Sequence, residues 1–492
     1  MRVLVTGGTG VIGAGLLPRL VRAGHTVRLL TRHADDDARE WPTQVEPFRG
    51  DVTSPERIAG AAEGCDAVVH ISGIVSEAPP DVTFERVNVG GTRNLLQEAQ
   101  RAGAPPFVFV SSLGAERGTS AYHASKRASE ELVRDYPGRF VIARPGNVYG
   151  PGDDVISMLL RMHRTLPAVP LVGLGTHRFQ PIFFADAGEA LAAAVEQDAV
   201  AGDFDIAGTE VTTPAAILEH FAELTGRAPA TIPVPETIVG LATRVADAAG
   251  IPLPIDESKF KMLIEHNVID PPWLNALGRI FGVSPTPLAD GLAFLVDAQP
   301  EQLPHTGVGT LQRKRFWADI HGGGLNAAGL MARFRESATR LMRIEFAAEP
   351  GAPQEIAEGV TLTAALPLRG NVQVRVEEVT PRRFTFATLK GHPLCGIVRF
   401  ETADRGSGGV RFSITVTARP ATALDWVAMN TLGRLMQDRN WVRTVEGAIE
   451  LSGGSSDGVH TDVETLDERT SEETEQEIAA LVSAHRRRDN AP

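Results

Sequence analysis

Short apolar runs alternate with stretches of helical periodicity along residues 1–150. The runs are continuous and rich in β-branched residues, which indicates strands buried on both faces of a parallel sheet. We therefore predict an α/β domain with a Rossmann-type doubly wound parallel sheet, covered by helices on both faces. The runs are RVLVTG, HTVRLLT, AVVHIS, FVFVSS and FVIARP, and the helical stretches are GAGLLPRLVRAG and GGTRNLLQEAQRAG.

The pattern changes after residue 150. Residues 151–300 mix Pro-rich loops with helical pieces and contain no second α/β repeat, which predicts a small substrate lobe built onto the first sheet. The first domain is therefore expected to span 1–300. Polar, Gly-containing residues 301–324 are typical of a linker.

A second domain is predicted over 325–452. Apolar and polar residues alternate there with turn signals, notably DRGSGG, and a long helical period follows. Antiparallel strands followed by a long helix make an α+β unit. Residues 453–492 are acidic and predict a largely disordered tail, with a short amphipathic helix within EETEQEIAALVSAHRRR.

Composition narrows the class of protein. The 492 residues are 43% hydrophobic with a net charge of −13, which argues weakly against nucleic acid or an anionic membrane as the main partner. Cys65 and Cys395 are far apart, so we expect no disulfide framework and no metal cluster of CxxC type. No apolar run reaches the roughly 18 residues of a membrane span. We expect a cytoplasmic protein with a small-molecule substrate and leave its oligomeric state open.

The segment TGGTGVIG follows the first predicted strand and opens the first predicted helix. Gly7, Gly10 and Gly13 stand three apart, a spacing that permits a tight turn, close approach of a pyrophosphate and close packing of the helix on its strand. The free N–H groups at the start of the helix would bind the phosphates. Thr9, Val11 and Ile12 complete this predicted dinucleotide-binding turn.

The second strand predicts which dinucleotide binds. Proteins that bind NAD usually place Asp or Glu after this strand, whereas this chain has Arg32. A guanidinium complements the 2′-phosphate of NADP. We therefore favour NADP, with NAD as the alternative because Asp35–Asp37 follow closely.

Several ordered motifs over residues 1 to about 225 resemble the short-chain dehydrogenase/reductase superfamily, in its extended or atypical branch that includes NAD-dependent epimerases and dehydratases. The resemblance implies that Asp51 and Val52 flank the adenine and that Ile71, Ser72 and Gly73 pass beside the ribose. It also implies that Asn88 lies near the active site and that Pro145, Gly146 and Asn147 lie beside the nicotinamide. The motifs are TGGTGVIG, GDV, DAVVHISG, VNVGGTRNLL, VSS, YHASK and RPGNVYGPGD.

The resemblance implies a catalytic Ser, Tyr and Lys. Ser112 would bind the substrate oxygen, Tyr122 would transfer the proton, and Lys126 would hold the ribose hydroxyls and lower the pKa of the tyrosine. The physical chemistry agrees, because an ammonium nearby favours the phenolate, and residues four apart share one face of a helix. Ser111 is the alternative to Ser112.

One departure weakens the inference of catalysis. Only nine residues, LGAERGTSA, separate Ser112 from Tyr122, fewer than in most extended members. This shortness resembles the atypical branch, some members of which are not catalytic. His70 ends a predicted buried strand, and we interpret it as a core residue rather than a catalyst.

Residues 325–452 resemble a helix-grip (START-like) domain and an uncharacterised bacterial and plant family with a similar G-H-P element. A helix-grip cavity would hold a hydrophobic ligand. We interpret Gly391, His392 and Pro393 as a tight turn, and Cys395 as a core residue.

The sequence therefore predicts an NADP-dependent oxidoreductase that moves hydride between nicotinamide and a carbonyl or alcohol carbon. The substrate is hydrophobic if the second domain presents it. The alternatives are a nucleotide-sugar epimerase or dehydratase, a non-catalytic dinucleotide-binding scaffold or redox sensor, and a lipid carrier.

Overall fold

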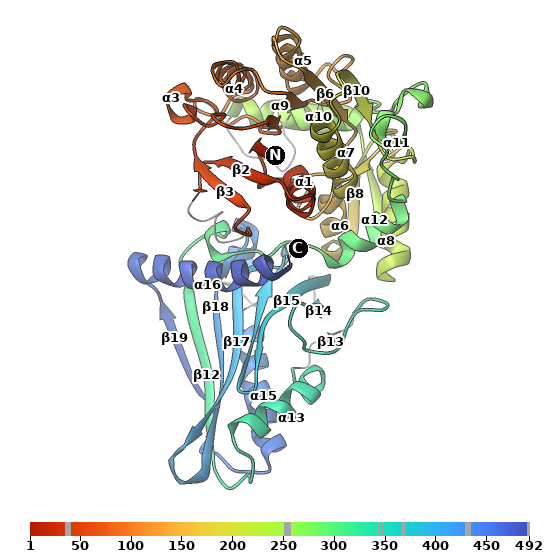
Figure 1. Ribbon diagram of the computed structural model, residues 1–492. Coiled ribbons are helices and arrows are strands. Elements are labelled where there is room, and N and C mark those ends of the chain that lie inside the picture. Colours follow the sequence, from red (N-terminus) through yellow and green to blue (C-terminus); the bar gives the residue numbers. More distant parts are fainter. Residues whose placement is uncertain are drawn as a thin grey trace.

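The computed structural model describes residues 1–34, 41–249, 257–342, 345–346, 348–366, 370–428 and 434–489. Figure 1 shows an upper domain that contains the amino terminus and a lower domain built on a second sheet. Among the described residues, no helix has both the length and the apolar character needed to cross a membrane.

Within the described chain, seven parallel strands form the upper sheet in the order β10-β6-β5-β4-β1-β2-β3. This is the strand order of a doubly wound Rossmann-type sheet, as predicted. The five predicted strands are present, but the pattern missed β3 and β10. Both are edge strands with partly exposed side chains, so their apolar runs are interrupted. The strands are β1 (Arg2–Thr6), β2 (Thr26–Thr31), β3 (Val45–Arg49), β4 (Ala67–His70), β5 (Phe107–Val110), β6 (Phe140–Pro145) and β10 (Gly202–Ile206).

Helices cover both faces of this sheet. Val3 and Val5 of β1 face one core cluster, and Leu4 between them faces another, because side chains alternate along a strand. The first cluster includes α1 (Val11–Arg22) and α7 (Phe184–Glu196), and the second includes α3 (Pro55–Ile58), α4 (Gly91–Arg101) and α5 (Ala121–Arg134). A π-helical turn, Glu85–Gly90, leads into α4.

A lobe of short elements is attached to the sheet, as predicted. Its core joins Leu160, Phe221 and Leu292 from three helices, α6, α8 and α12. The elements are β7 (Val148–Tyr149), α6 (Ile156–Thr165), β8 (Ala168–Val172), β9 (Ile182–Phe183), α8 (Pro214–Thr225), β11 (Ala230–Val234), α9 (Glu236–Ala249), α10 (Glu257–Ile264), α11 (Ala276–Arg279) and α12 (Leu288–Asp297), with 3-10 turns at Pro272–Leu274 and Pro304–Thr306.

The lower domain is an antiparallel sheet with helices α13 and α15 packed on one face. Phe334 of α13 and Trp441 of α15 lie in one buried cluster with Phe400 and Phe412 of the sheet. The hairpin predicted at DRGSGG joins β17 to β18. The strand order is β13-β14-β15-β16-β17-β18-β12-β19. The elements are β12 (Gln312–Ile320), α13 (Ala327–Leu341), β13 (Glu345–Phe346), β14 (Thr361–Leu366), β15 (Gly370–Thr380), β16 (Arg383–Thr388), β17 (Leu394–Arg405), β18 (Gly409–Pro420), α14 (Ala423–Ala428), α15 (Arg434–Ser452), β19 (His460–Thr465) and α16 (Glu468–Asp489).

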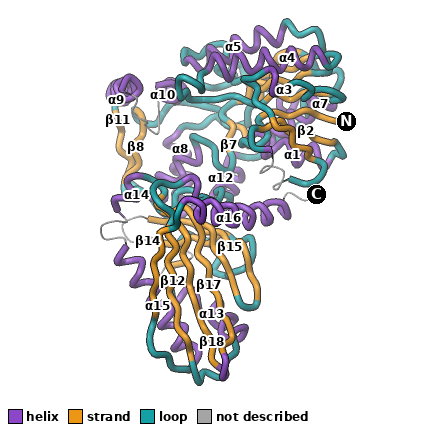
Figure 2. Tube along the Cα trace, turned by 90° about the vertical axis from the view of Figure 1, so that its left-hand side faces the viewer, coloured by secondary structure: helices purple, strands orange, loops and turns teal. Residues whose placement is uncertain are grey.

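Two predicted boundaries of this domain are wrong. The segment interpreted as a linker over 301–324 contains β12, which lies between β18 and β19 in the sheet. The segment interpreted as a disordered tail over 453–492 contains β19 and α16, and α16 crosses the sheet near the upper domain (Figures 1 and 2). Ile478 and Val482 of α16 pack on Ala387 and Ile397. Strand β19 is exposed at every residue, so hydrogen bonds to β12, rather than an apolar run, define it.

Candidate active site

A cleft of about 930 Å³ opens at the carboxyl ends of β1, β4 and β5, where parallel sheets bind ligands. The predicted site residues converge on it, apart from Gly13 and Asn88. The predicted residues that line it are Gly7, Thr9, Gly10, Val11, Ile12, Arg32, Asp51, Val52, Ile71, Ser72, Gly73, Ser112, Tyr122, Lys126, Pro145, Gly146 and Asn147.

The glycine-rich turn has the shape of a phosphate cradle. Gly7 has a φ of +72°, and a Cβ there would lie 2.7 Å from the backbone nitrogen of Ser72. Gly13 does not line the cleft, but a Cβ on it would lie 2.1 Å from the Gly8 carbonyl oxygen, so it permits the close packing that was predicted. No side chain among the described residues caps α1, and its first turn carries no acidic residue. The turn therefore fits a pyrophosphate.

Asn88 lies behind the cleft and supports the loop that forms its wall. Its Oδ1 accepts the N–H of Ile74 at 2.8 Å, and its Nδ2 donates to the Ile74 carbonyl at 3.1 Å and to Ser125 Oγ at 2.9 Å. The side chain therefore joins the loop after β4 to α5.

Arg32 lies at the rim of the cleft close to Asp51. Burial acts to raise the pKa of Asp51, but hydrogen bonds from Thr53 and the charge of Arg32 outweigh it and hold the pKa below its usual value. Arg28 lies within β2, the strand that precedes Arg32. Its side chain donates to the carbonyls of Gly60, Ala61 and Glu63 and not to the cleft. Residues Asp35–Asp37 lie outside the described residues.

The two serines after β5 have different partners. Ser111 Oγ donates to Glu130 Oε1 at 2.5 Å inside the protein. Both serines line the cleft, but Ser112 forms a hydrogen bond with Tyr122. The structure therefore places Ser112, not Ser111, beside the tyrosine.

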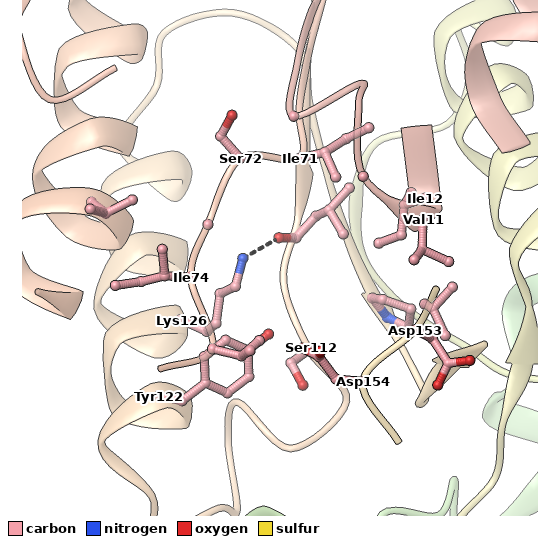
Figure 3. A pocket seen from close by; sticks show the side chains of 18 of the residues that line it. Val11, Ile12, Ile71, Ser72, Ile74, Ser112, Tyr122, Lys126, Asp153 and Asp154 are labelled. Carbon is pink, nitrogen blue, oxygen red and sulfur yellow. Dashed lines mark hydrogen bonds between the residues drawn. The ribbon is translucent and has the colours of Figure 1, made fainter. Parts of the chain in front are cut away.

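Tyr122 and Lys126 project from α5 into the cleft, and both are buried. Figure 3 shows the Tyr122 ring beside Ser112 and the Lys126 amine, with Asp153 on the opposite side near Val11 and Ile12. Lys126 Nζ donates to the Val110 carbonyl at 2.8 Å. Ser120 caps α5 by accepting the N–H of His123, which fixes where the helix begins.

The pKa values of Tyr122 and Lys126 differ from those expected from the sequence. Burial raises the pKa of Tyr122 to about 12, against a hydrogen bond from Ser112 that lowers it. Burial also lowers the pKa of Lys126 to about 8, against the charge of Glu130. The expected lowering of the tyrosine pKa by the lysine is therefore wrong for this structure, because the cost of burying a charge dominates at both groups.

His70 is a core residue, as interpreted from the sequence. Its ring nitrogens lie 2.7 Å from Thr6 Oγ1 and 3.0 Å from Thr92 Oγ1. Burial lowers its pKa to about 3, and the charge of Lys126 acts in the same direction. The imidazole is therefore neutral, and both of its ring nitrogens have hydroxyl partners inside the core.

Sequence reasoning missed the apolar side of the cleft. Val155, Ile156 and Met158 from the start of α6, and Met262 and Leu263 from α10, also line the cleft. These helices lie in the Pro-rich region whose spacing carries no motif, so only their length and apolar character were visible. The one available signal was RPGNVYGPGD, which ends on Asp153 at the start of this wall.

The short segment before Tyr122 is fastened by a residue far along the chain. Glu265 Oε1 accepts the backbone N–H of Thr119 at 2.6 Å and its hydroxyl at 2.8 Å. Glu265 Oε2 lies 2.9 Å from His123 Nδ1. Glu265 therefore holds both the nine-residue segment and the first turn of α5 in place.

Comparison with known proteins agrees with the fold of the upper domain. Residues 3–207 match the NAD dependent epimerase/dehydratase family, a range that spans the parallel sheet of the upper domain. Residues 322–446 match a domain of unknown function, DUF1990, which covers most of the lower domain.

Individual relatives cover the upper domain. A ceramide reductase of Caulobacter vibrioides is 34% identical over 192 residues, 39% of this chain and 60% of its own length. A 3 beta-hydroxysteroid dehydrogenase/Delta 5→4-isomerase of Mycobacterium tuberculosis is 34% identical over 183 residues, 32% of this chain and 49% of its own length. The chain thus spans about half to three fifths of these relatives. The UDP-glucose 4-epimerase of Thermus thermophilus, solved in complex with NAD, is 27% identical with a TM-score of 0.47, covering 60% of this chain and 98% of its own.

Proposed function

We propose that this protein is an NADP-dependent oxidoreductase of the short-chain dehydrogenase/reductase type that interconverts a carbonyl and an alcohol. One observation carries the proposal: Ser112, Tyr122 and Lys126 meet in the same cleft as the glycine-rich turn. The bound dinucleotide would supply or accept the hydride. A turnover screen with NADPH across 3-ketosteroids, long-chain ketones and quinones tests the proposal, and absence of NADPH oxidation with all three classes would refute it.

The chain's own residues would handle the substrate oxygen and its proton. In reduction, Ser112 donates a hydrogen bond to the carbonyl oxygen, and Tyr122 gives its proton to the oxygen as negative charge develops there. A pKa of about 12 keeps Tyr122 protonated at neutral pH, so it is ready to act as the acid. Lys126 would hold the ribose hydroxyls from the same face of α5.

The apolar wall supports a hydrophobic substrate. Met158, Met262 and Leu263 line the cleft, and such a lining favours apolar ligands. The names of the two curated relatives, a ceramide reductase and a hydroxysteroid dehydrogenase, agree with this class of substrate.

Arg32 would select NADP, and this leads to a prediction. We expect Arg32→Ala to weaken NADPH binding about tenfold, because a charge-assisted hydrogen bond to a phosphate contributes roughly 1.5–3 kcal/mol. NADH binding should stay within about twofold, since NADH has no 2′-phosphate. Fluorescence titration with both nucleotides measures this. Equal affinity of the wild type for the two nucleotides would contradict the preference for NADP.

The lowered pKa of Lys126 leads to a prediction of how NADPH binding depends on pH. Burial lowers its pKa to about 8, so the ammonium loses its proton as the pH rises past that value. We expect NADPH affinity to fall above about pH 8, and we expect Lys126→Met to bind NADPH weakly without this inflection. An unchanged NADPH affinity of the wild type across pH 8 to 10.5 would contradict the role of Lys126.

The same lowered pKa affects the stability of the fold. Because an unfolded lysine holds its proton up to about pH 10.5, Lys126 makes the fold more stable as the pH rises from about 8 toward 10.5.

A non-catalytic scaffold is the second candidate, favoured by the short segment before Tyr122. The geometry weighs against it. Glu265 fastens that segment, and Tyr122 still reaches Ser112. A scaffold needs the glycine-rich turn but has no chemical use for the polar set around Tyr122.

A further inference from the structure

Helix α6 connects the cleft with the lower domain. Its first turn contributes Ile156 and Met158 to the apolar wall. Its later turns lie against β15 of the lower domain, at the junction visible in Figure 1. The wall that faces the substrate and the surface that meets the second domain are therefore parts of one rigid element.

Arg164, near the end of α6, is buried in this junction. Its Nε and Nη2 donate to the two carboxylate oxygens of Glu349 at 2.8 and 2.6 Å. Its Nη1 donates to Gln373 Oε1 at 2.7 Å, and Nη2 also donates to the Val296 carbonyl at 3.1 Å. The side chains of Arg164 and Glu349 are only 5% and 3% exposed, so this ion pair is shielded from water and salt.

The backbones also approach closely at this point. Gly370, which begins β15, has a φ of +70°, and a Cβ on it would lie 2.1 Å from the Arg164 carbonyl oxygen. The same carbonyl accepts a hydrogen bond from Arg227 of the upper domain. A side chain at residue 370 would collide with this carbonyl, so the close approach of β15 to α6 depends on glycine.

A second contact reaches the loop that leads into α6. A Cβ on Gly152 would lie 3.8 Å from Lys390 Nζ and 3.3 Å from Pro300 Cγ. Gly391, the first residue of the G-H-P turn, has a φ of +100° and packs on the aliphatic part of Arg161, where a Cβ would lie 3.4 Å from Cγ. This turn therefore meets both the loop and the helix of the substrate wall.

The charges around Lys390 link it to the cleft. Burial lowers the pKa of Lys390, and the charge of Arg161 acts in the same direction, while Asp154 and Asp153 oppose both. Asp153 and Asp154 themselves line the cleft. Lys390 thus lies next to a loop whose acidic residues also line the cleft.

We propose that the lower domain is a clamp that positions the substrate wall of the cleft, holding α6 through Arg164 and Glu349 and the loop 150–154 through Lys390. This proposal rests on the proposed function for its kinetic consequence. Lys390 and Glu349 are positioning residues, because they act through the wall and do not reach the cleft. The clamp gives the DUF1990 domain a role in substrate affinity but none in nucleotide binding.

Hydrogen–deuterium exchange of the full chain tests the clamp without knowledge of the substrate. We expect amides of residues 150–165 to exchange about tenfold faster in Glu349→Gln, which removes the charged partner of the buried Arg164, and in Lys390→Met, which removes the cation beside Asp153 and Asp154. Exchange over residues 1–13 should stay at the wild-type rate. Arg382→Ala is the matched control, since Arg382 pairs with Asp404 on the exposed surface of the same domain.

NADPH affinity and steady-state kinetics distinguish a failure of the clamp from a failure of the proposed function. NADPH affinity should be unchanged in both variants, whereas the KM for a 3-ketosteroid probe should rise about fivefold or more with little change in kcat, the signature of lost substrate binding. Lys390→Arg should restore both exchange and KM. Wild-type exchange over 150–165 in both folded variants would overturn the clamp, whatever the activity. Absence of NADPH-dependent turnover in the wild type would instead overturn the proposed function and leave the exchange result standing.

Discussion

We expect Tyr122→Phe to lower the rate of carbonyl reduction by about 10²- to 10⁴-fold, the usual contribution of a positioned general acid. The variant loses only the hydroxyl that meets Ser112. The ring remains in its buried place beside Phe84, with the ring centroids 6.1 Å apart. The fold and the nucleotide cradle should therefore persist, and NADPH affinity should stay within about twofold of the wild type.

Tyr136→Phe is the matched control for this experiment. Tyr136 lies near the end of the same helix, but its hydroxyl donates to the Pro105 carbonyl and does not line the cleft. The control should keep full turnover. Undiminished turnover in Tyr122→Phe would remove the tyrosine from the mechanism. If the wild type and Tyr122→Phe were equally inert while both bound NADPH, the protein would be a scaffold.

The second large effect concerns stability. We expect Glu130→Ala to lower the free energy of unfolding by about 3–5 kcal/mol, the usual cost of removing one partner of a buried ion pair. Glu130 is completely buried and accepts hydrogen bonds from Arg144 Nε and Nη2 at 2.7 and 2.6 Å, and from Ser111. Its loss leaves Arg144, only 6% exposed, with the more exposed carboxylates Glu116 and Asp203.

Chemical unfolding in urea measures this loss, and Glu131→Ala, an exposed neighbour on the same helix, is the control. The pH dependence gives a second check. Burial acts to raise the pKa of Glu130, but the hydrogen bonds from Arg144 and Ser111 outweigh it and hold the pKa low. The stabilisation is therefore present at neutral pH and is lost as the pH falls through the lowered pKa, so the variant should lose less stability in acid than the wild type. A loss below about 1 kcal/mol at neutral pH would show that the pair contributes no more than a surface ion pair.

Local features of the chain were enough to predict the nucleotide half of the site. The turn around Gly7 and Gly10 depends on residues that are adjacent in sequence, and the spacing of Tyr122 and Lys126 depends on one helix. Continuous apolar runs predicted the five inner strands because a parallel sheet buries them on both faces. The same reasoning failed for β3 and β10 at the edges, where one side of the strand meets water.

Contacts between distant parts of the chain decided the rest. Glu130 accepts the hydrogen bond of Ser111, and Ser112 is the serine that bonds the tyrosine. Pairing with β12 makes a strand of the polar segment His460–Thr465. The apolar wall of the cleft exists because the lobe folds back over the sheet and the lower domain meets α6 from the other side. Thus the sequence by itself determined the sheet, the glycine-rich turn and the tyrosine–lysine helix, because each is specified by neighbouring residues. Only the tertiary structure decided which serine bonds the tyrosine, how burial shifts the tyrosine and lysine pKa values, and which apolar residues line the cleft, because burial and ion pairing depend on residues far apart in the chain.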